Sequence, residues 1–183
     1  MGAAENPVRR QILETIAVTP GIHMRELSRV VHVSLTGVAH HARILEMDGK
    51  VVGISDGHYR RYFLSTLVLP NEARTLTDDE RRLLAESKRP TSLAIILNLA
   101  VDGPLRHHEI ERRVGRRKGT VSFHLSRLLS NGVVRVLPGS PPEGYSLANP
   151  DRVISLLVTF AGSLRDHKDA FANLWALLER SQP

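Results

Sequence analysis

The side chains of this sequence that could do chemistry are cationic and hydrogen-bonding groups at helical spacing. Thr36, His40 and Arg43 follow one another at intervals of four and three residues, which places them on one face of a helix. The apolar residues of the same segment repeat on the opposite face. An arginine can donate twice to a guanine edge, and a hydroxyl can contact a base or a phosphate. The spacing therefore predicts a polar contact surface.

The segment 7–64 predicts the elements that position this surface. Pro7 suits the first turn of a helix, Pro20-Gly21 ends it, and a short helix follows over 24–31. Ser34 is the expected N-cap of the third helix, which ends before Gly49, and a hairpin turns at Asp56-Gly57. The order is a helix-turn-helix followed by a wing. The expected buried residues are Val8, Ile12, Leu13, Ile16, Leu27, Val30, Val31, Val38, Ala42 and Leu45.

The same pattern occurs twice in the chain. When residues 7–64 are aligned without a gap to residues 90–147, 14 of the 58 pairs are identical. Identical pairs fall at apolar positions with helical spacing and at the glycine that closes the longest helix, as in Val38/Val121 and Gly49/Gly132. A repeat of this kind indicates one structural unit used twice.

The second copy predicts the same elements. Helices are expected over residues 91–101, 107–114 and 117–131, and strands near residues 133–137 and 144–147. The prolines between these strands stiffen the tip of the second wing and keep it out of the ladder.

Two segments carry a resemblance to a known family. GRRKGTVSFHLSRLLSNGVVRV resembles the recognition-helix segment of winged helix-turn-helix transcription regulators of the ArsR/MarR type, especially archaeal versions with a T-V-S-aromatic-His-Leu core. VSLTGVAHHARILEMDGKVV is similar to a more diverged copy with the His-His pair of ArsR-like proteins. The resemblance covers residues 7–64 and 90–147. It implies two winged-helix units and binding to double-stranded DNA.

In the first unit, the resemblance implies that the third helix faces the DNA major groove. The residues opposite Val38 are Thr36, His40, Arg43 and Met47. We therefore expect base and phosphate contacts from Ser34, Thr36, His40 and Arg43. Arg60 and Arg61 follow the tip of the wing, where winged-helix proteins use arginines on the backbone or in the minor groove. The alternative is a solvated helix face for the helix residues and an exposed strand charge for Arg60 and Arg61.

In the second unit, the outward face offers fewer base-reading groups. It presents Gly119, Phe123 and Ser126, while Arg116, Arg117 and Lys118 lead into the helix. Three cations at a helix N-terminus favour a phosphate. We expect this unit to anchor the DNA backbone while the first unit reads sequence. Arg117 replaces the serine that commonly caps this helix in the family.

The histidines of the sequence favour structural roles over metal binding or catalysis. His41 and His124 occupy the same place in the two units, beside the buried face, and we expect structural imidazoles hydrogen-bonded to a neighbouring loop. The clusters around His107-His108-Glu109 and Asp166-His167 lack the spacing of a metal site, and cysteine is absent. No phosphate loop, dinucleotide-binding turn or nucleophile elbow occurs. We expect no metal, no cofactor and no enzyme activity.

The segments outside the repeats predict helices. Thr77 and Glu80 form a capping box for a linker helix over 75–87. After Asn149-Pro150, a series of mainly apolar residues follows coiled-coil spacing. Two alternatives stay open for it: packing on the second unit, or homodimerisation. The series is Leu157, Ala161, Leu164, Lys168, Phe171, Trp175 and Leu178.

Composition limits the class of protein. The formal net charge is +6; the basic excess lies in residues 1–75 (9 Lys/Arg against 7 Asp/Glu) and 76–150 (12 against 8), while residues 151–183 balance at 4 and 4. A basic excess suits a polyanionic partner. No apolar run approaches the ~20 residues that cross a bilayer. We expect a cytoplasmic, nucleoid-associated protein without a signal peptide.

Together these patterns predict a mainly α protein with small β-hairpins, of the α+β class, with two tandem winged helix-turn-helix domains. The expected boundaries are domain one over 1–70, a linker helix over 71–89, domain two over 90–150 and a C-terminal helical segment over 151–183. The expected function is sequence-specific binding of double-stranded DNA to regulate transcription. The alternatives are a protein–protein adaptor and, more weakly, a binder of RNA or single strands that stacks bases on Phe123, Tyr59 and Tyr62.

Overall fold

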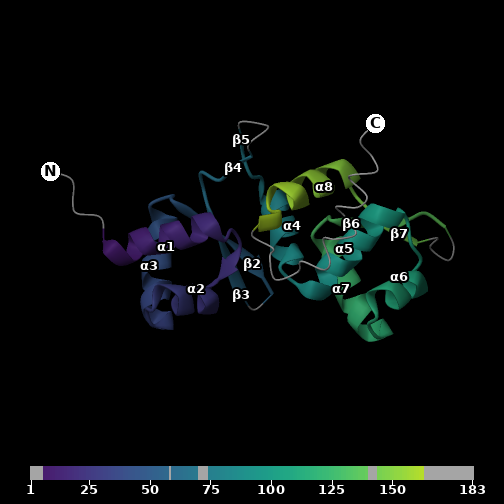
Figure 1. Ribbon diagram of the computed structural model, residues 1–183, viewed down its shortest axis with the longest axis horizontal. Coiled ribbons are helices and arrows are strands. Elements are labelled where there is room, and N and C mark those ends of the chain that lie inside the picture. Colours follow the sequence, from purple (N-terminus) through teal and green to yellow (C-terminus); the bar gives the residue numbers. More distant parts are fainter. Residues whose placement is uncertain (1–5, 58, 70–73, 140–143, 163–183) are drawn as a thin grey trace. The chain divides into compact units, whose positions relative to one another are not determined.

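The computed structural model describes residues 6–57, 59–69, 74–139 and 144–162. The chain divides into two compact units, Met1–Ala85 and Glu86–Pro183. Figure 1 shows the first unit in purple and blue and the second in teal, green and yellow. Each unit contains three helices followed by a β-hairpin, in that chain order.

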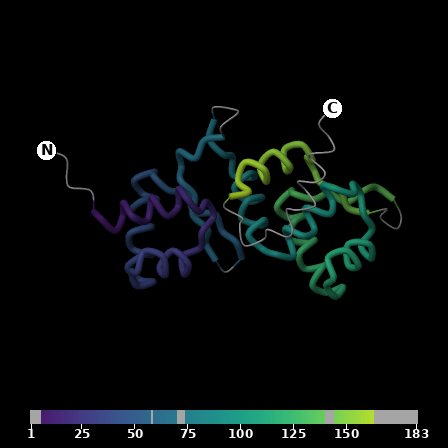
Figure 2. Tube along the Cα trace, viewed as in Figure 1, coloured from purple at the N-terminus to yellow at the C-terminus, as the bar shows by residue number. Residues whose placement is uncertain are grey.

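The first unit begins with the three helices α1 (Pro7–Val18), α2 (Met24–Val31) and α3 (Leu35–Met47). Side chains cap all three at the N-terminus, where backbone N–H groups have no partner within the helix. Asn6 accepts hydrogen bonds from the first turn of α1, His23 from Glu26 of α2, and the predicted cap Ser34 from Gly37 of α3. Figure 2 follows the chain through these helices.

The core of the first unit confirms most of the predicted apolar stripes. Val8 and Leu13 are partly buried at its edge, as the spacing implies. The prediction for Val30 was wrong, because this residue lies near the end of α2 off the Leu27–Val31 stripe and is 47% exposed. The fully packed residues of the three helices are Ile12, Ile16, Leu27, Val31, Val38, Ala42 and Leu45.

A three-stranded antiparallel sheet completes the helix-turn-helix part of this unit. Its order is β1 (Ile22–His23), β3 (Tyr59–Leu64) and β2 (Val51–Asp56). The hairpin of β2 and β3 was predicted, but its turn lies one residue later than expected, because Asp56 pairs with Tyr59. Gly57, with φ +65°, therefore occupies the turn, and Asp56 belongs to the strand. The short strand β1 had no signal in the sequence.

The first unit ends in a short hairpin and the start of a helix. The hairpin joins β4 (Val68–Leu69) to β5 (Arg74–Thr75), and α4 runs over Asp78–Ser87. The predicted capping box is present: the backbone N–H of Thr77 donates to the Glu80 carboxylate, and the backbone N–H of Glu80 donates to the Thr77 hydroxyl. Arg74 also donates to the Glu80 carboxylate at 2.7 Å.

The second unit has the element order that its sequence predicts. Its helices are α5 (Pro90–Asp102), α6 (His107–Val114) and α7 (Lys118–Ser130). A two-stranded antiparallel sheet follows, formed by β6 (Val134–Leu137) and β7 (Gly144–Leu147).

The helix α8 (Pro150–Thr159) packs against α5 within the second unit. Asn149 caps it by accepting from the N–H of Arg152, and Val153, Leu156 and Leu157 are buried. Of the two alternatives left open by the sequence, packing on the second unit holds for this first part of the C-terminal segment. The rest of the coiled-coil series, from Leu164 onward, lies outside the described residues.

A buried carboxylate at the end of α4 belongs to the second unit. Glu86 is 1% exposed and accepts hydrogen bonds from Arg127 and Asn131 at the C-terminal end of α7. It also accepts from the Ser92 hydroxyl of α5 at 3.1 Å. A buried charge is tolerated only when it is paired and hydrogen-bonded, and these donors meet that requirement.

Replacing Glu86 tests this role. We predict that Glu86→Gln lowers the free energy of unfolding by about 3 kcal/mol, because the Arg127 guanidinium loses its anionic partner in a mostly buried site. The matched control is Asp79→Asn, which removes an exposed ion pair with Arg82 and should cost less than about 1 kcal/mol. Urea unfolding measures both, and equal losses in the two variants would contradict the prediction.

Candidate nucleic-acid interface

The outward face of α3 carries the side chains that the sequence predicts for it. Thr36, His40, Arg43 and Met47 are all exposed, and Met47 is 78% exposed. This follows from the apolar stripe on the opposite side of the helix, which the core buries completely. Ser34 is exposed as well, but its hydroxyl accepts from the N–H of Gly37 at 3.2 Å, so it also serves as the helix cap.

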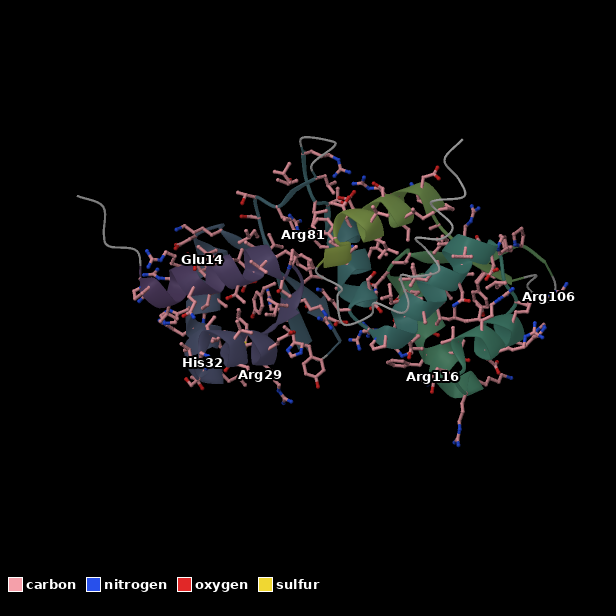
Figure 3. The ribbon with its side chains drawn as sticks, viewed as in Figure 1. Glu14, Arg29, His32, Arg81, Arg106 and Arg116 are labelled. Atoms are coloured by element: carbon pink, nitrogen blue, oxygen red, sulfur yellow. The ribbon has the colours of Figure 1, made fainter. Side chains whose placement is uncertain are left out.

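The sequence analysis missed two further cations, on the second helix of the motif. Arg25 and Arg29 lie one helical turn apart on α2 and are both exposed. Figure 3 labels Arg29 on the surface of this helix, next to His32 in the turn that leads to α3. Within the described part of the chain, neither arginine forms an ion pair, and Arg43 forms none either. Helical spacing, which placed His40 and Arg43 on one face of α3, also places Arg25 and Arg29 on one face of α2 and could have identified them.

The structure gives Arg61 a structural place rather than the predicted position on the DNA. The side chain is buried, its Nε donates to the Asp56 carboxylate at 2.6 Å, and its Nη1 donates to the carbonyl of Gly21 at 2.9 Å. Asp56 is itself 3% exposed. The pair ties the wing hairpin to the turn after α1. The predicted DNA contact by Arg61 does not fit this structure, because the side chain is buried and two of its nitrogens donate inside the unit.

Arg60 points to the other face of the hairpin and is half-exposed. Its Nη2 lies 2.7 Å from the Glu46 carboxylate of α3, and its Nε also donates to that oxygen at 3.1 Å. A DNA contact by Arg60, as predicted, would compete with this bond to Glu46.

In the second unit the predicted residues at the start of α7 are exposed, including Arg116, Arg117 and Lys118. Arg117 occupies the N-cap position and makes no side-chain capping bond, as its residue type implies. Ser126 is exposed, and Phe123 is 56% exposed with the Arg127 guanidinium 5.9 Å from its ring centre.

The two equivalent histidines differ in their surroundings. Nδ1 of His124 lies 2.9 Å from the Ser92 hydroxyl, so its partner comes from helix α5 rather than from a loop. For His41 the expected hydrogen bond is absent, because its Nδ1 is buried without a partner in the described structure. Burial is the main cause that lowers the pKa of both imidazoles, and it also lowers the pKa of His23.

A third histidine connects two helices of the second unit. Nδ1 of His107 contacts the Glu111 carboxylate, and its Nε2 lies 2.9 Å from the Ser122 hydroxyl. Through these contacts His107 links α6 to α7. Among the described residues, no group of three or more His, Asp or Glu side chains could hold a metal ion. Asp166 and His167 lie outside the described residues.

One protein-family model matches most of the first unit. Residues 6–76 match the family model described as an N-terminal HTH domain. The chain therefore contains a helix-turn-helix domain, and the match covers α1 to α3 and both strands of the wing hairpin. A domain of this kind suggests a DNA-binding regulator. No curated protein matches the chain. No helix in the described structure is long and apolar enough to span a bilayer.

Replacing Arg61 and Arg43 separately by methionine distinguishes a structural arginine from a surface arginine. We predict that Arg61→Met lowers the free energy of unfolding by about 3 kcal/mol, because the buried Asp56 carboxylate loses its ion pair with the Arg61 guanidinium. Arg43→Met, at an exposed position without an ion pair, should change it by no more than about 0.5 kcal/mol. Urea unfolding at neutral pH measures the difference, and a mild effect of Arg61→Met would refute the structural role.

The lowered histidine pKa values predict how stability depends on pH. Because the pKa values of His41 and His124 in the folded state lie below the ordinary 6.5, the unfolded chain binds more protons than the folded chain does. The neutral imidazoles therefore contribute to the free energy of unfolding above pH 6.5, and this contribution is lost as the pH falls below that value. We expect the free energy of unfolding to fall between about pH 7.5 and 5.5, and to fall less in His124→Asn. Equal stability of the wild type at both pH values would contradict this.

Proposed function

We propose that the protein is a sequence-specific, double-stranded DNA-binding transcription regulator. One observation carries the proposal: in the helix-turn-helix domain, α2 and α3 expose arginines that lack ion-pair partners among the described residues. Arg61, which serves the fold, is by contrast paired with Asp56. Unpaired guanidinium groups on this motif suit phosphates and base edges.

The first unit reads the sequence in this proposal. Helix α3 enters the major groove with Thr36, His40 and Arg43 toward the bases, where the Arg43 fork matches the O6 and N7 acceptors of guanine. Helix α2 crosses the DNA backbone, and Arg25 and Arg29 neutralise phosphates there. The hydroxyl of Ser34 at the N-terminus of α3 adds a phosphate contact.

The second unit acts as a second winged helix that holds the backbone. The support is the shared order of three helices and a hairpin, together with the exposed cations Arg116, Arg117 and Lys118 before and at the start of α7. Phe123 and Ser126 then face the groove with little base discrimination. The corresponding domains are 1–70 and 90–150, and the linker between them contains α4 (Asp78–Ser87).

The remaining parts of the proposal follow from the same reading. The protein acts without a metal, cofactor or catalytic step, in the cytoplasm at the nucleoid. The C-terminal segment, 151–183, supplies a homodimer contact beyond the part of α8 that packs on α5. The alternative is a protein–protein adaptor, which predicts only weak, salt-labile attraction to DNA.

Binding to a labelled random-sequence duplex of about 30 base pairs, across a salt series, tests the proposal. Each neutralised phosphate contributes about −0.9 to the slope of log K against log salt, so we expect a slope corresponding to several phosphates. Arg116→Ala/Arg117→Ala/Lys118→Ala should reduce that slope. Negligible binding at low salt would leave the adaptor as the better account.

Selection of preferred sequences then tests the role of Arg43. We predict that Arg43→Ala relaxes the preference at one base position, at a cost of about 1–3 kcal/mol for the selected site. Arg29→Ala is the matched control on the neighbouring helix. It should weaken binding to all sequences alike and reduce the salt slope by about 0.9. Unchanged base preference in Arg43→Ala would contradict the assignment.

A further inference from the structure

An ion pair joins the recognition helix to the wing. Glu46 lies in the last turn of α3, and Arg60 lies on β3, next to the hairpin turn. Two nitrogens of the guanidinium donate to the same carboxylate oxygen, at 2.7 and 3.1 Å. A second donor restricts the orientation of the pair more than a single contact would.

Gly53 of β2 provides the space for this pair. A Cβ atom at position 53 would overlap both Nε of Arg60 and Oε1 of Glu46. Gly53 is not among the described glycines with positive φ, so the backbone here does not require glycine. Position 53 therefore has no room for a side chain while Arg60 and Glu46 contact each other over it.

Tyr62 lies two residues after Arg60 on β3. It pairs with Gly53 across the hairpin and is 2% exposed. Burial raises the pKa of the Tyr62 hydroxyl, and the Glu46 carboxylate raises it further, while Arg60 acts against them. The phenol of Tyr62 therefore lies within electrostatic range of the carboxylate and the guanidinium.

The exposure of the pair limits what it can contribute to stability. The side chains of Arg60 and Glu46 are 49% and 23% exposed, and solvent-accessible ion pairs of this kind contribute little to folding. The effect of the pair is therefore better sought in the orientation of α3 relative to the β2–β3 hairpin than in the stability of the fold.

We propose that Glu46 and Arg60, seated across Gly53, are positioning residues that set the orientation of α3 relative to the β2–β3 hairpin. This rests on the proposed function for its effect on DNA: the orientation lets helix and wing reach the duplex together. Arg60 serves the interface through Glu46 and makes no phosphate contact of its own.

Gly53→Ala is the most informative variant, because it displaces the pair and leaves every charge in place. The displaced atoms are the ends of flexible side chains, so the fold remains. We expect duplex affinity to fall by about tenfold at an unchanged salt slope. Glu46→Gln should also weaken binding. Ser55→Ala, an exposed position on the same strand, is the matched control and should bind as the wild type does.

A direct phosphate contact by Arg60 predicts the opposite signs. In that case Glu46→Gln releases the guanidinium and removes a negative charge, so affinity rises, and Arg60→Met lowers the salt slope by about 0.9. Either result would overturn the proposal.

A measurement without DNA separates this proposal from the proposed function. Residual dipolar couplings of backbone N–H groups report the orientation of α3 relative to the hairpin. We expect Gly53→Ala and Glu46→Gln to change that orientation and Ser55→Ala to preserve it. The same orientation in all variants would refute the positioning role. If the wild type binds no duplex, the proposed function fails, and the couplings alone decide this inference.

Discussion

The burial of one stripe of α3 is the constraint on which the candidate interface depends. Val38 and Leu45 are at most 1% exposed, and burying such a side chain contributes about 1.5–3 kcal/mol. Rotating the helix would expose this stripe, so the core fixes which residues face outward. The positions of Thr36, His40 and Arg43 at the surface are therefore consequences of hydrophobic packing at the opposite face.

The arginines of the chain differ in the groups that they contact, and these contacts indicate their roles. Arg61 and Arg127 are held by buried carboxylates and serve the fold. Arg60 is held by Glu46 at the surface, between a helix and a strand. Arg29 and Arg43 have no ion-pair partner among the described residues and lie on the motif that the family model matches. A net charge of +6 does not distinguish these cases, whereas the contacts do.

Local signals in the sequence predicted the helices, the caps Ser34 and Thr77, and the hairpin, because caps, turns and stripes act within a few residues. Contacts between distant segments were not predictable in this way. The burial of Arg61 depends on its bond to Gly21, 40 residues away, and on a hairpin register one residue different from the expected one. The hydrogen bond between Glu86 and Asn131 also joins distant segments and was not predictable. Nor was the difference between the two equivalent histidines: Nδ1 of His41 has no partner in the described structure, whereas Nδ1 of His124 contacts Ser92.

The central claim is that the outward face of α3 contacts double-stranded DNA. Chemical-shift mapping of the isotope-labelled protein with a short duplex tests it most directly. The account predicts that shifts concentrate at residues 34–43 and at Arg25 and Arg29, while the buried residues Ile12 and Ile16 change little. Shifts that leave α3 unaffected, or no shifts at low salt, would contradict it.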